Sequence, residues 1–305
     1  MALGYDKNLY ILAFDHRGSF QKSVLGIKGR PPTSEEDATI SDLKTLVAEG
    51  FETALEQGAP ADACGVLVDE QYGAEVVRRA RENGWIFAMP VEKSGQDTFD
   101  FEYGDEFGKH IEEFDTTFSK VLVRYNPADP DEDRELQAGR LRQLSDWLHE
   151  RDRKFLFELL VPANDEQLAL VEGDTETYDS DVRPGLMIEV ITELQNAGVE
   201  PDIWKIEGID RREDCERIAE TVRRNGRDGV GCVVLGRGAD AEKVEHWLRQ
   251  GARVPGYLGL AIGRTIWFDP LKAFVDGTID REPAAAQVAA NYRRYVDVYA
   301  AAAGS

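Results

Sequence analysis

Long apolar runs, cysteines and histidines are scarce in this 305-residue chain, and these shortages exclude several classes of protein. No stretch approaches the roughly 18 consecutive apolar residues that suggest a membrane-spanning helix, so we expect no membrane partner. The first residues lack a basic segment followed by an apolar one, so we expect no secretory signal peptide. Of the three cysteines, Cys64 and Cys232 fall in apolar runs, which is typical of buried thiols in a cytoplasmic protein.

Basic residues are also few. The 36 lysines and arginines stand against 58 aspartates and glutamates, which gives a formal net charge of −22. Such a chain repels a phosphate backbone, and this excludes nucleic acid as a main partner. The acidic excess fits a saline habitat or a general need for solubility, and the composition leaves both open. It makes any place where basic residues gather informative about the ligand.

Apolar runs that are rich in strand-forming residues recur eight times along the chain. Near-continuous apolar strands of this kind are typical of a sheet that is covered on both faces. At 305 residues and 42% hydrophobic composition, the chain can form one barrel-sized domain or two smaller ones. The eight runs are 9–14, 64–68, 86–89, 120–125, 154–161, 203–207, 229–235 and 257–262.

Helical patterns separate these strands, for example over 35–57, 134–150 and 240–250. Eight strands that alternate with helices predict a (β/α)8 TIM barrel, an α/β fold, as one domain over residues 1–305. The alternative is a doubly wound open sheet, which the lack of a Gly-x-Gly-x-x-Gly motif after the first strand disfavours. An Ala- and Tyr-rich helix over about 283–302 closes or dimerises the barrel, so we expect a homo-oligomer.

Three connections are longer than helix packing needs: 16–34, 90–116 and 162–183. Each follows a strand, and therefore lies at the barrel face where enzymes of this fold place their active sites. We expect these loops to set the stereochemistry of the substrate.

Lys205 is the most informative single residue, because it lies within the apolar strand 203–207. Its neighbours Trp204 and Ile206 are large and apolar, so the strand is expected to be buried and a charge there is costly. A buried lysine is a candidate amine nucleophile, with a pKa lowered by burial and by cationic neighbours. The alternative is a structural ion pair with Glu207 or another carboxylate.

Strand alternation predicts which charged groups accompany this lysine. Lys205 faces the barrel interior, and by the same rule Glu158 and Asp15 point into the barrel mouth from their own strands. An amine flanked by carboxylates is what Schiff-base chemistry needs, since the amine attacks a ketone while the carboxylates move protons. Lys120 or Arg124 then supplies the positive field that keeps Lys205 partly neutral.

Glycine–arginine pairs end the last two strands. Gly236-Arg237-Gly238 follows the seventh strand and Gly263-Arg264 follows the eighth, where barrels commonly bind phosphate. Glycine lets backbone N–H groups approach an anion, and arginine adds paired donors. With Arg17 after the first strand and Arg124 on the fourth, these residues predict a site for a phosphorylated small molecule.

A metal centre is the alternative chemistry. A zinc-dependent enzyme of this kind needs several histidines as ligands, and only His16 lies at a strand end among His16, His110, His149 and His246. A magnesium site built from Asp69, Glu70 and Glu92 is a further alternative. We expect neither, and therefore no metal and no cofactor.

Four segments carry a family resemblance: 9–20 (LYILAFDHRGSF), 154–162 (KFLFELLVP), 201–208 (PDIWKIEG) and 234–238 (VLGRG). Over about residues 8–295 the chain resembles the aldolase-like domain that is fused to the sugar kinase of myo-inositol catabolism. More distantly, it is similar to the class I tagatose 1,6-bisphosphate aldolases and the sulfofructose-phosphate aldolases.

By position, the resemblance implies that Asp15, Lys120, Glu158 and Lys205 are catalytic, with Lys205 as the imine-forming residue. Arg264 matches a phosphate-binding arginine, whereas His16 stands where the tagatose enzymes usually have glutamine. The implied reaction converts 2-deoxy-5-keto-gluconate 6-phosphate to dihydroxyacetone phosphate and malonate semialdehyde. Tagatose 1,6-bisphosphate and sulfofructose 1-phosphate are alternative substrates. A metal-dependent isomerase or epimerase, and a barrel that binds a sugar phosphate without turnover, are the alternatives of other kinds.

Overall fold

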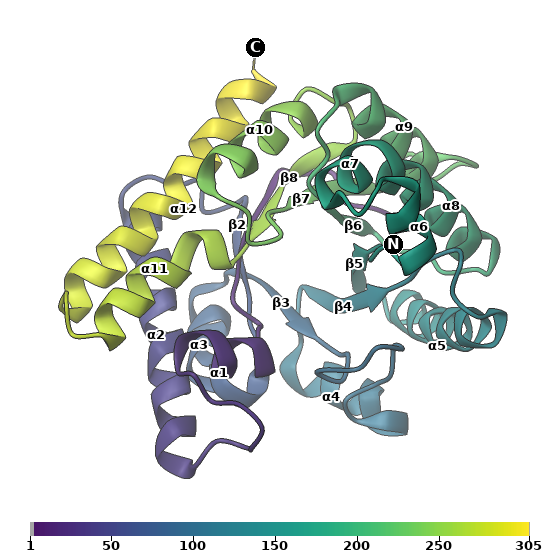
Figure 1. The fold of residues 1–305 in the computed structure, drawn as a ribbon. Helices are drawn as coiled ribbons and strands as arrows, with labels where there is room; N and C mark the ends of the chain where they lie inside the picture. The colour runs from purple at the N-terminus through teal and green to yellow at the C-terminus, as the bar shows by residue number, and fades with distance from the viewer. Residues whose placement is uncertain (1–2, 305) are drawn as a thin grey trace.

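Eight parallel strands close into a barrel in the computed structural model, which describes residues 3–304 (Figure 1). Strands pair in chain order, and β8 pairs back with β1. The predicted (β/α)8 barrel is confirmed, and the open-sheet alternative is wrong. The strands are β1 (Leu9–Ala13), β2 (Cys64–Leu67), β3 (Ile86–Pro90), β4 (Phe118–Arg124), β5 (Lys154–Leu160), β6 (Ile203–Glu207), β7 (Gly231–Leu235) and β8 (Tyr257–Ile262).

Helices cover the outside of the barrel, as βαβ crossovers require. Their ends follow ordinary capping rules: Thr33 forms a capping box with Glu36, and Gly84 ends a helix in the left-handed conformation at φ 65°. The helices are α1 (Gly18–Val24), α2 (Ser34–Glu56), α3 (Glu70–Asn83), η1 (Gly104–Glu106), α4 (Phe107–Phe114), α5 (Asp131–Glu150), α6 (Asp165–Leu170), α7 (Thr175–Thr177), η2 (Tyr178–Val182), α8 (Arg183–Asn196), α9 (Arg212–Arg223), α10 (Ala241–Gly251), α11 (Arg264–Val275) and α12 (Arg281–Ala303).

The core has two parts, because strand side chains alternate between the barrel interior and the helices. Leu156 and Ile203 belong to the small interior cluster, whereas Trp204 and Ile206 belong to the larger cluster between strands and helices. The predicted facing of β6 is therefore confirmed. The same alternation carries Lys205 inward, directly above the apolar interior.

The predicted long loops contain short helices. Residues 16–34 include α1, residues 90–116 include η1 and α4, and residues 162–183 include α6, α7 and η2. These helices have eight residues or fewer, too few to give a helical period in the sequence. Strand β4 begins at Phe118, so Lys120 is its third residue rather than its first.

The C-terminal helix α12 packs against α2, α10 and α11 along one side of the barrel (Figure 1). Its tyrosines Tyr292, Tyr295 and Tyr299 are buried in the chain's own core. These tyrosines therefore pack within the chain itself and close the barrel wall. The expected homo-oligomer stays a prediction. In the described part of the chain, no helix is long and apolar enough to cross a membrane. All three cysteines are buried and unpaired.

Candidate active site

The carboxyl ends of the strands surround a cavity of about 770 Å³, within the size range of small-molecule sites. Ten of the eleven residues predicted from the sequence line it: Asp15, Arg17, Lys120, Arg124, Glu158, Lys205, Arg237, Gly238, Gly263 and Arg264. Gly236 is the exception. It is buried beneath the loop, and its carbonyl accepts a hydrogen bond from the N–H of Ala239.

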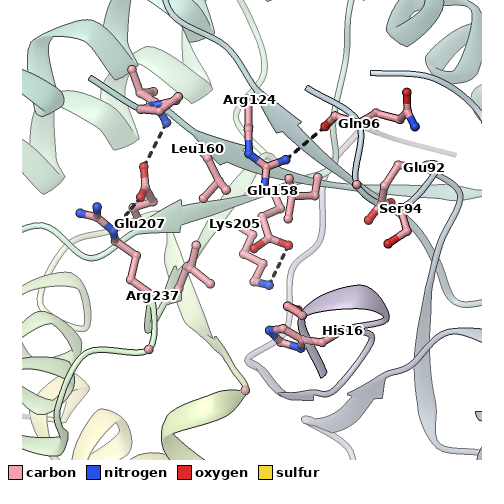
Figure 2. Close-up of a pocket in the computed structure, with 18 of the residues that line it drawn as sticks. His16, Glu92, Ser94, Gln96, Arg124, Glu158, Leu160, Lys205, Glu207 and Arg237 are labelled. Carbon is pink, nitrogen blue, oxygen red and sulfur yellow. Dashed lines mark hydrogen bonds and ion pairs between the residues drawn. The ribbon is translucent and has the colours of Figure 1, made fainter. Parts of the chain in front are cut away.

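Lys205 lies on the floor of this cavity and pairs with Glu158, not with Glu207. Its Nζ is 2.9 Å from Oε2 of Glu158, on the neighbouring strand at the same register. Figure 2 shows the two side chains directed at one another. Lys205 is only 2% exposed, so the ion pair lies almost entirely out of water.

Lys120 occupies a different environment, although it lies close by. Its Nζ is 2.8 Å from Oδ2 of Asp15, 2.8 Å from Oε1 of Glu92 and 3.1 Å from Oε2 of Glu158. Burial alone would lower the pKa of Lys120, but the three carboxylates raise it well above its usual value. Lys120 is thus a fixed cation at the centre of the site.

The three carboxylates around Lys120 differ in their proton affinity. Burial raises a carboxyl pKa, yet for Asp15 and Glu158 the adjacent lysines outweigh burial and lower the pKa. For Glu92, burial prevails over Lys120 and the pKa is raised. Its Oε2 has no hydrogen-bond partner among the described residues. Glu92 is therefore the carboxyl of the three most disposed to hold a proton.

His16 is held neutral at the edge of the cavity. Burial lowers its pKa to about 4, against the opposing attraction of Asp15. Its ring packs edge-on against Trp267 with 5.4 Å between ring centroids, and Nδ1 is 3.9 Å from Oδ1 of Asp15. A neutral imidazole here offers a donor or an acceptor without adding charge.

The loop after β1 is anchored by buried charges. Arg17 donates to Oε2 of Glu102 at 3.0 Å and to the carbonyl of Glu92. Lys44, on α2, donates to the carbonyl of His16 at 3.0 Å and forms a fully buried ion pair with Asp69. Two of the donors of Arg17 are thus used within the protein. The contacts of Arg17 and Lys44 hold the loop that carries Asp15 in place.

The seventh-strand arginine is also engaged. Arg237 pairs with Asp179 of η2, and its Nε is 3.0 Å from Oε1 of Glu207. Gly238 follows at φ 75°, and a Cβ at this position would lie 2.6 Å from the guanidinium of Arg264. Arg264 itself donates to the carbonyl of Arg237 at 2.9 Å. Of the two arginines, Arg264 keeps its charge available to a ligand.

The magnesium alternative does not fit this geometry, because its three carboxylates face different partners. Asp69 pairs with Lys44, Glu70 contacts His110 at 3.2 Å, and Glu92 contacts Lys120. Among residues 3–304, no group of three or more His, Cys, Asp or Glu side chains is arranged to hold a metal ion.

A protein-family model described as "Uncharacterized protein conserved in bacteria (DUF2090)" matches residues 4–303. The chain belongs to this family. No curated protein matches the DUF2090 chain significantly.

Solved structures share the barrel of this DUF2090 protein at low sequence identity. Fructose-bisphosphate aldolase from Plasmodium falciparum, solved with TRAP and a small-molecule inhibitor, has a TM-score of 0.62 and 16% identity over 98% of this chain and 91% of that chain. Cgl0159 from Corynebacterium glutamicum has a TM-score of 0.57 and 17% identity, covering 96% and 88%. A Schiff base-forming fructose-1,6-bisphosphate aldolase, solved for its reaction intermediates, has a TM-score of 0.56 and 14% identity over 96% of this chain and 94% of that chain. These similarities establish the fold.

The sequence does not predict the roles of three residues that shape the site of the DUF2090 protein. It indicates Glu92 as a possible metal ligand and as one of the charges at the strand ends, but not as a partner of Lys120, although Glu92 continues the inward alternation of Ala88 and Pro90. Lys44 occupies a buried position on α2, four residues after Ile40, and its place in that apolar stripe was a usable signal. Glu102 had no signal, because its contact with Arg17 depends on the fold of the loop after β3.

Proposed function

We propose that this DUF2090 protein is a class I aldolase, in which Lys205 forms a Schiff base with a phosphorylated keto-sugar. The observation that carries the proposal is the contrast between two buried lysines. Lys120 is surrounded by three carboxylates, whereas Lys205 pairs with Glu158 alone among the described residues. Lys120 therefore holds its proton, and Lys205 is the amine that remains for attack on a carbonyl.

Schiff-base formation begins when Glu158 takes a proton from Lys205 across their 2.9 Å contact. The free amine attacks the ketone carbon, and a proton passes from its nitrogen to the carbonyl oxygen to give a neutral carbinolamine. Glu158, now protonated, returns its proton to the departing hydroxyl, and water leaves as the iminium forms. Lys120 stabilises the Glu158 carboxylate through these steps.

Carbon–carbon cleavage uses the iminium as an electron sink. A carboxylate, Glu158 or Asp15, removes the proton from the hydroxyl β to the iminium carbon. The C–C bond breaks, its electron pair forms an enamine on Lys205, and an aldehyde leaves. The enamine carbon then takes a proton, and water hydrolyses the resulting iminium to release the ketone product.

The proposed substrate is 2-deoxy-5-keto-gluconate 6-phosphate, which yields dihydroxyacetone phosphate and malonate semialdehyde. Support comes from the resemblance of the four sequence segments to the aldolase-like domain of myo-inositol catabolism. Tagatose 1,6-bisphosphate and sulfofructose 1-phosphate are the alternatives. The phosphate next to the ketone binds at Arg264 and Gly238, where glycine and arginine give an anion close access.

Borohydride trapping tests the proposal directly. Reduction in the presence of dihydroxyacetone phosphate is expected to add one covalent adduct, which peptide mass spectrometry places on Lys205. Lys205→Ala should abolish the adduct, and the matched variant Lys120→Arg, which keeps its charge, should retain it. An adduct that survives Lys205→Ala would overturn the mechanism. Tight binding of phosphorylated ketoses without any adduct would instead indicate a binding protein.

A further inference from the structure

We propose that Leu122 and Leu160 select the substrate through an apolar contact with the carbon beside the one that becomes the aldehyde, and that this carbon carries no hydroxyl. The inference rests on the proposed function, because it takes the reacting hydroxyl of the ketose to lie at Glu158. It adds a substrate class: a phosphorylated keto-sugar with a methylene group at that carbon. This class includes 2-deoxy-5-keto-gluconate 6-phosphate but not tagatose 1,6-bisphosphate or sulfofructose 1-phosphate, which carry a hydroxyl there.

Leu122 and Leu160 are unusual among the strand residues, because they belong to neither cluster of the core. Both are partly exposed, and both line the cavity. Leu235 on β7 shares these properties, whereas every other leucine, isoleucine and valine of the eight strands lies in or against one of the two core clusters. Exposed leucines on helices, such as Leu136 and Leu170, are ordinary surface residues. A strand leucine that faces only the cavity therefore indicates an apolar part of the ligand.

Strand register places the two leucines around Glu158. Leu122 lies opposite Glu158 on β4, and Leu160 is two residues beyond Glu158 on β5. Residues two apart on a strand share a face and are about 6–7 Å apart along it. Figure 2 shows Leu160 directed into the same cavity as Glu158 and Lys205. The leucines thus form an apolar layer next to the carboxylate that faces the reacting carbons.

This layer lies where the departing half of the substrate passes. The phosphate is proposed to bind at Arg264 beyond β8, and the ketone carbon reacts at Lys205 on β6. Glu158 is on β5, the next strand in the ring, so a chain that runs past Lys205 to Glu158 continues toward β4. The carbon beside the one that becomes the aldehyde then meets Leu160 and Leu122.

A hydroxyl on this carbon would lose its hydrogen bonds to water and would find no partner on either leucine. Arg124, two residues beyond Leu122 on β4, is directed to the loop after β3, where it donates to the carbonyl of Gln96 at 3.3 Å. A methylene group instead loses nothing and gains apolar contact. Apolar pockets reject an added hydroxyl by about a hundredfold at most, so we expect a preference of about 10–100-fold.

Aldol addition, the reverse of cleavage, compares two aldehydes that differ by one hydroxyl. The enamine of dihydroxyacetone phosphate on Lys205 forms the C–C bond to the aldehyde carbon, and the aldehyde oxygen takes the proton held by the carboxyl group. Water then hydrolyses the resulting iminium to release the product. Propanal has a methylene group beside its carbonyl, and 2-hydroxypropanal has a hydroxyl there. In the wild-type protein, kcat/KM should be about 10–100-fold higher for propanal.

Variants of similar size assign the preference to the leucines and cancel the intrinsic reactivity of the aldehydes. Leu122→Asn and Leu160→Asn offer the hydroxyl a partner and should each reduce the preference about tenfold, whereas Leu160→Met keeps the apolar contact and should retain it. Leu136→Asn, at an exposed leucine of α5 outside the cavity, is the matched control and should change nothing. The borohydride adduct with dihydroxyacetone phosphate, which lacks the carbon concerned, shows whether each variant keeps its active site.

Two alditol phosphates test the contact without Schiff-base chemistry. Sorbitol 6-phosphate and 2-deoxysorbitol 6-phosphate differ only by the hydroxyl at the carbon concerned, and neither can form an imine with Lys205. In calorimetry, the wild-type protein should bind the deoxy compound about tenfold more tightly, and Leu160→Asn should lose this difference.

In a protein that forms the adduct, two results would overturn the contact: equal kcat/KM for the two aldehydes, or a propanal preference that both asparagine variants retain in full. In a protein that forms no adduct, the aldolase proposal fails and calorimetry decides on the contact. Tighter binding of the deoxy compound that is lost in Leu160→Asn then supports the contact alone. Equal binding of the two alditol phosphates, or no binding of either, overturns the contact as well.

Discussion

Lys205 and Lys120 reach the same atom, Oε2 of Glu158, at 2.9 and 3.1 Å. One carboxylate thus serves two buried ammonium groups that come from different strands. Asp15 and Glu92 complete the environment of Lys120 but are not paired with Lys205. This asymmetry makes Glu158 the link between the fixed cation and the reactive amine.

Replacing Glu158 with glutamine should slow Schiff-base formation strongly. The variant loses the proton acceptor 2.9 Å from Lys205, and general acid–base groups contribute about 10²–10⁴-fold to rate. The rate of borohydride-trapped adduct formation measures the loss. Glu207→Gln is the matched control, since Glu207 also points inward but pairs with Arg237. Adduct formation in Glu158→Gln at the wild-type rate would contradict the assigned role.

Removing the charge of Lys120 should destabilise the fold at neutral pH. Lys120→Met leaves three carboxylates without their cation, and breaking a buried ion pair in this way costs about 3–5 kcal/mol. Without the lysine, the carboxyl pKa values in the folded state rise above those in the unfolded state. The folded state of the variant then binds more protons, so its stability relative to that of the wild-type protein should increase as the pH falls from 7 to 5.

Urea unfolding at both pH values checks the sign. In the wild-type protein, Asp15 and Glu158 have lowered pKa values, so their contribution to stability is nearly constant between pH 7 and 5 and is lost only as the pH falls below their ordinary values of 3.8 and 4.5. The variant should therefore gain stability relative to the wild-type protein between pH 7 and 5. Lys120→Arg keeps the charge and should keep the wild-type slope. Because His16 lowers the stability of both proteins over this range, a Lys120→Met protein that loses as much stability as the wild-type protein between pH 7 and 5 would refute the argument.

His16 should make stability depend on pH between about 6.5 and 4. Its pKa falls from an ordinary 6.5 to about 4 in the folded state, because burial disfavours the imidazolium. Between these values the unfolded state binds the proton and the folded state does not, so stability is lost as the pH falls. With allowance for its partial exposure, the effect is about 1–3 kcal/mol. In urea unfolding, His16→Gln should lose less stability than wild type over this range. Equal losses would contradict the shift.

The inward-facing residues of the site could be predicted because strand alternation fixes their direction. Lys205, Glu158 and Asp15 follow apolar partners at two-residue spacing, and closure of the barrel brings their strand ends together. Lys120 could be assigned as a neighbour of this set, but not as the partner of three carboxylates. The contacts of Lys120 with three carboxylates bring together side chains from four different strands or strand ends, and the sequence does not show how closely these side chains approach one another.

Residue pairing across loops could not be predicted. Arg237 has the sequence context of a phosphate ligand, yet it pairs with Asp179, 58 residues away in η2. Arg17 is similarly held by Glu102. Such contacts depend on the conformation of short helices and turns, whose sequences carry no period. Arg264 has much the same sequence context but no ion pair in the described chain.

Arg264 and Arg237 should therefore respond differently to substitution. Arg264→Gln should raise KM for a phosphorylated ketose by about 10–100-fold, since a charged hydrogen bond to phosphate is lost, and leave stability unchanged. Arg237→Gln should release Asp179 and Glu207 and loosen residues 175–182. Hydrogen exchange over 175–182 and steady-state kinetics measure the two effects. Faster exchange over 175–182 in Arg264→Gln, or exchange at the wild-type rate in Arg237→Gln, would contradict this assignment.

Chelation should leave the reaction intact. The carboxylates that a magnesium site would need are already committed, Asp69 to Lys44, Glu70 to His110 and Glu92 to Lys120. The proposed electron sink is an iminium on Lys205, which needs no Lewis acid. After dialysis against EDTA, the yield of borohydride-trapped adduct and the rate of ketose cleavage should both equal those of untreated protein. Loss of cleavage that Mg²⁺ or Zn²⁺ restores, with trapping absent throughout, would favour a metal-dependent isomerase or epimerase on the same barrel.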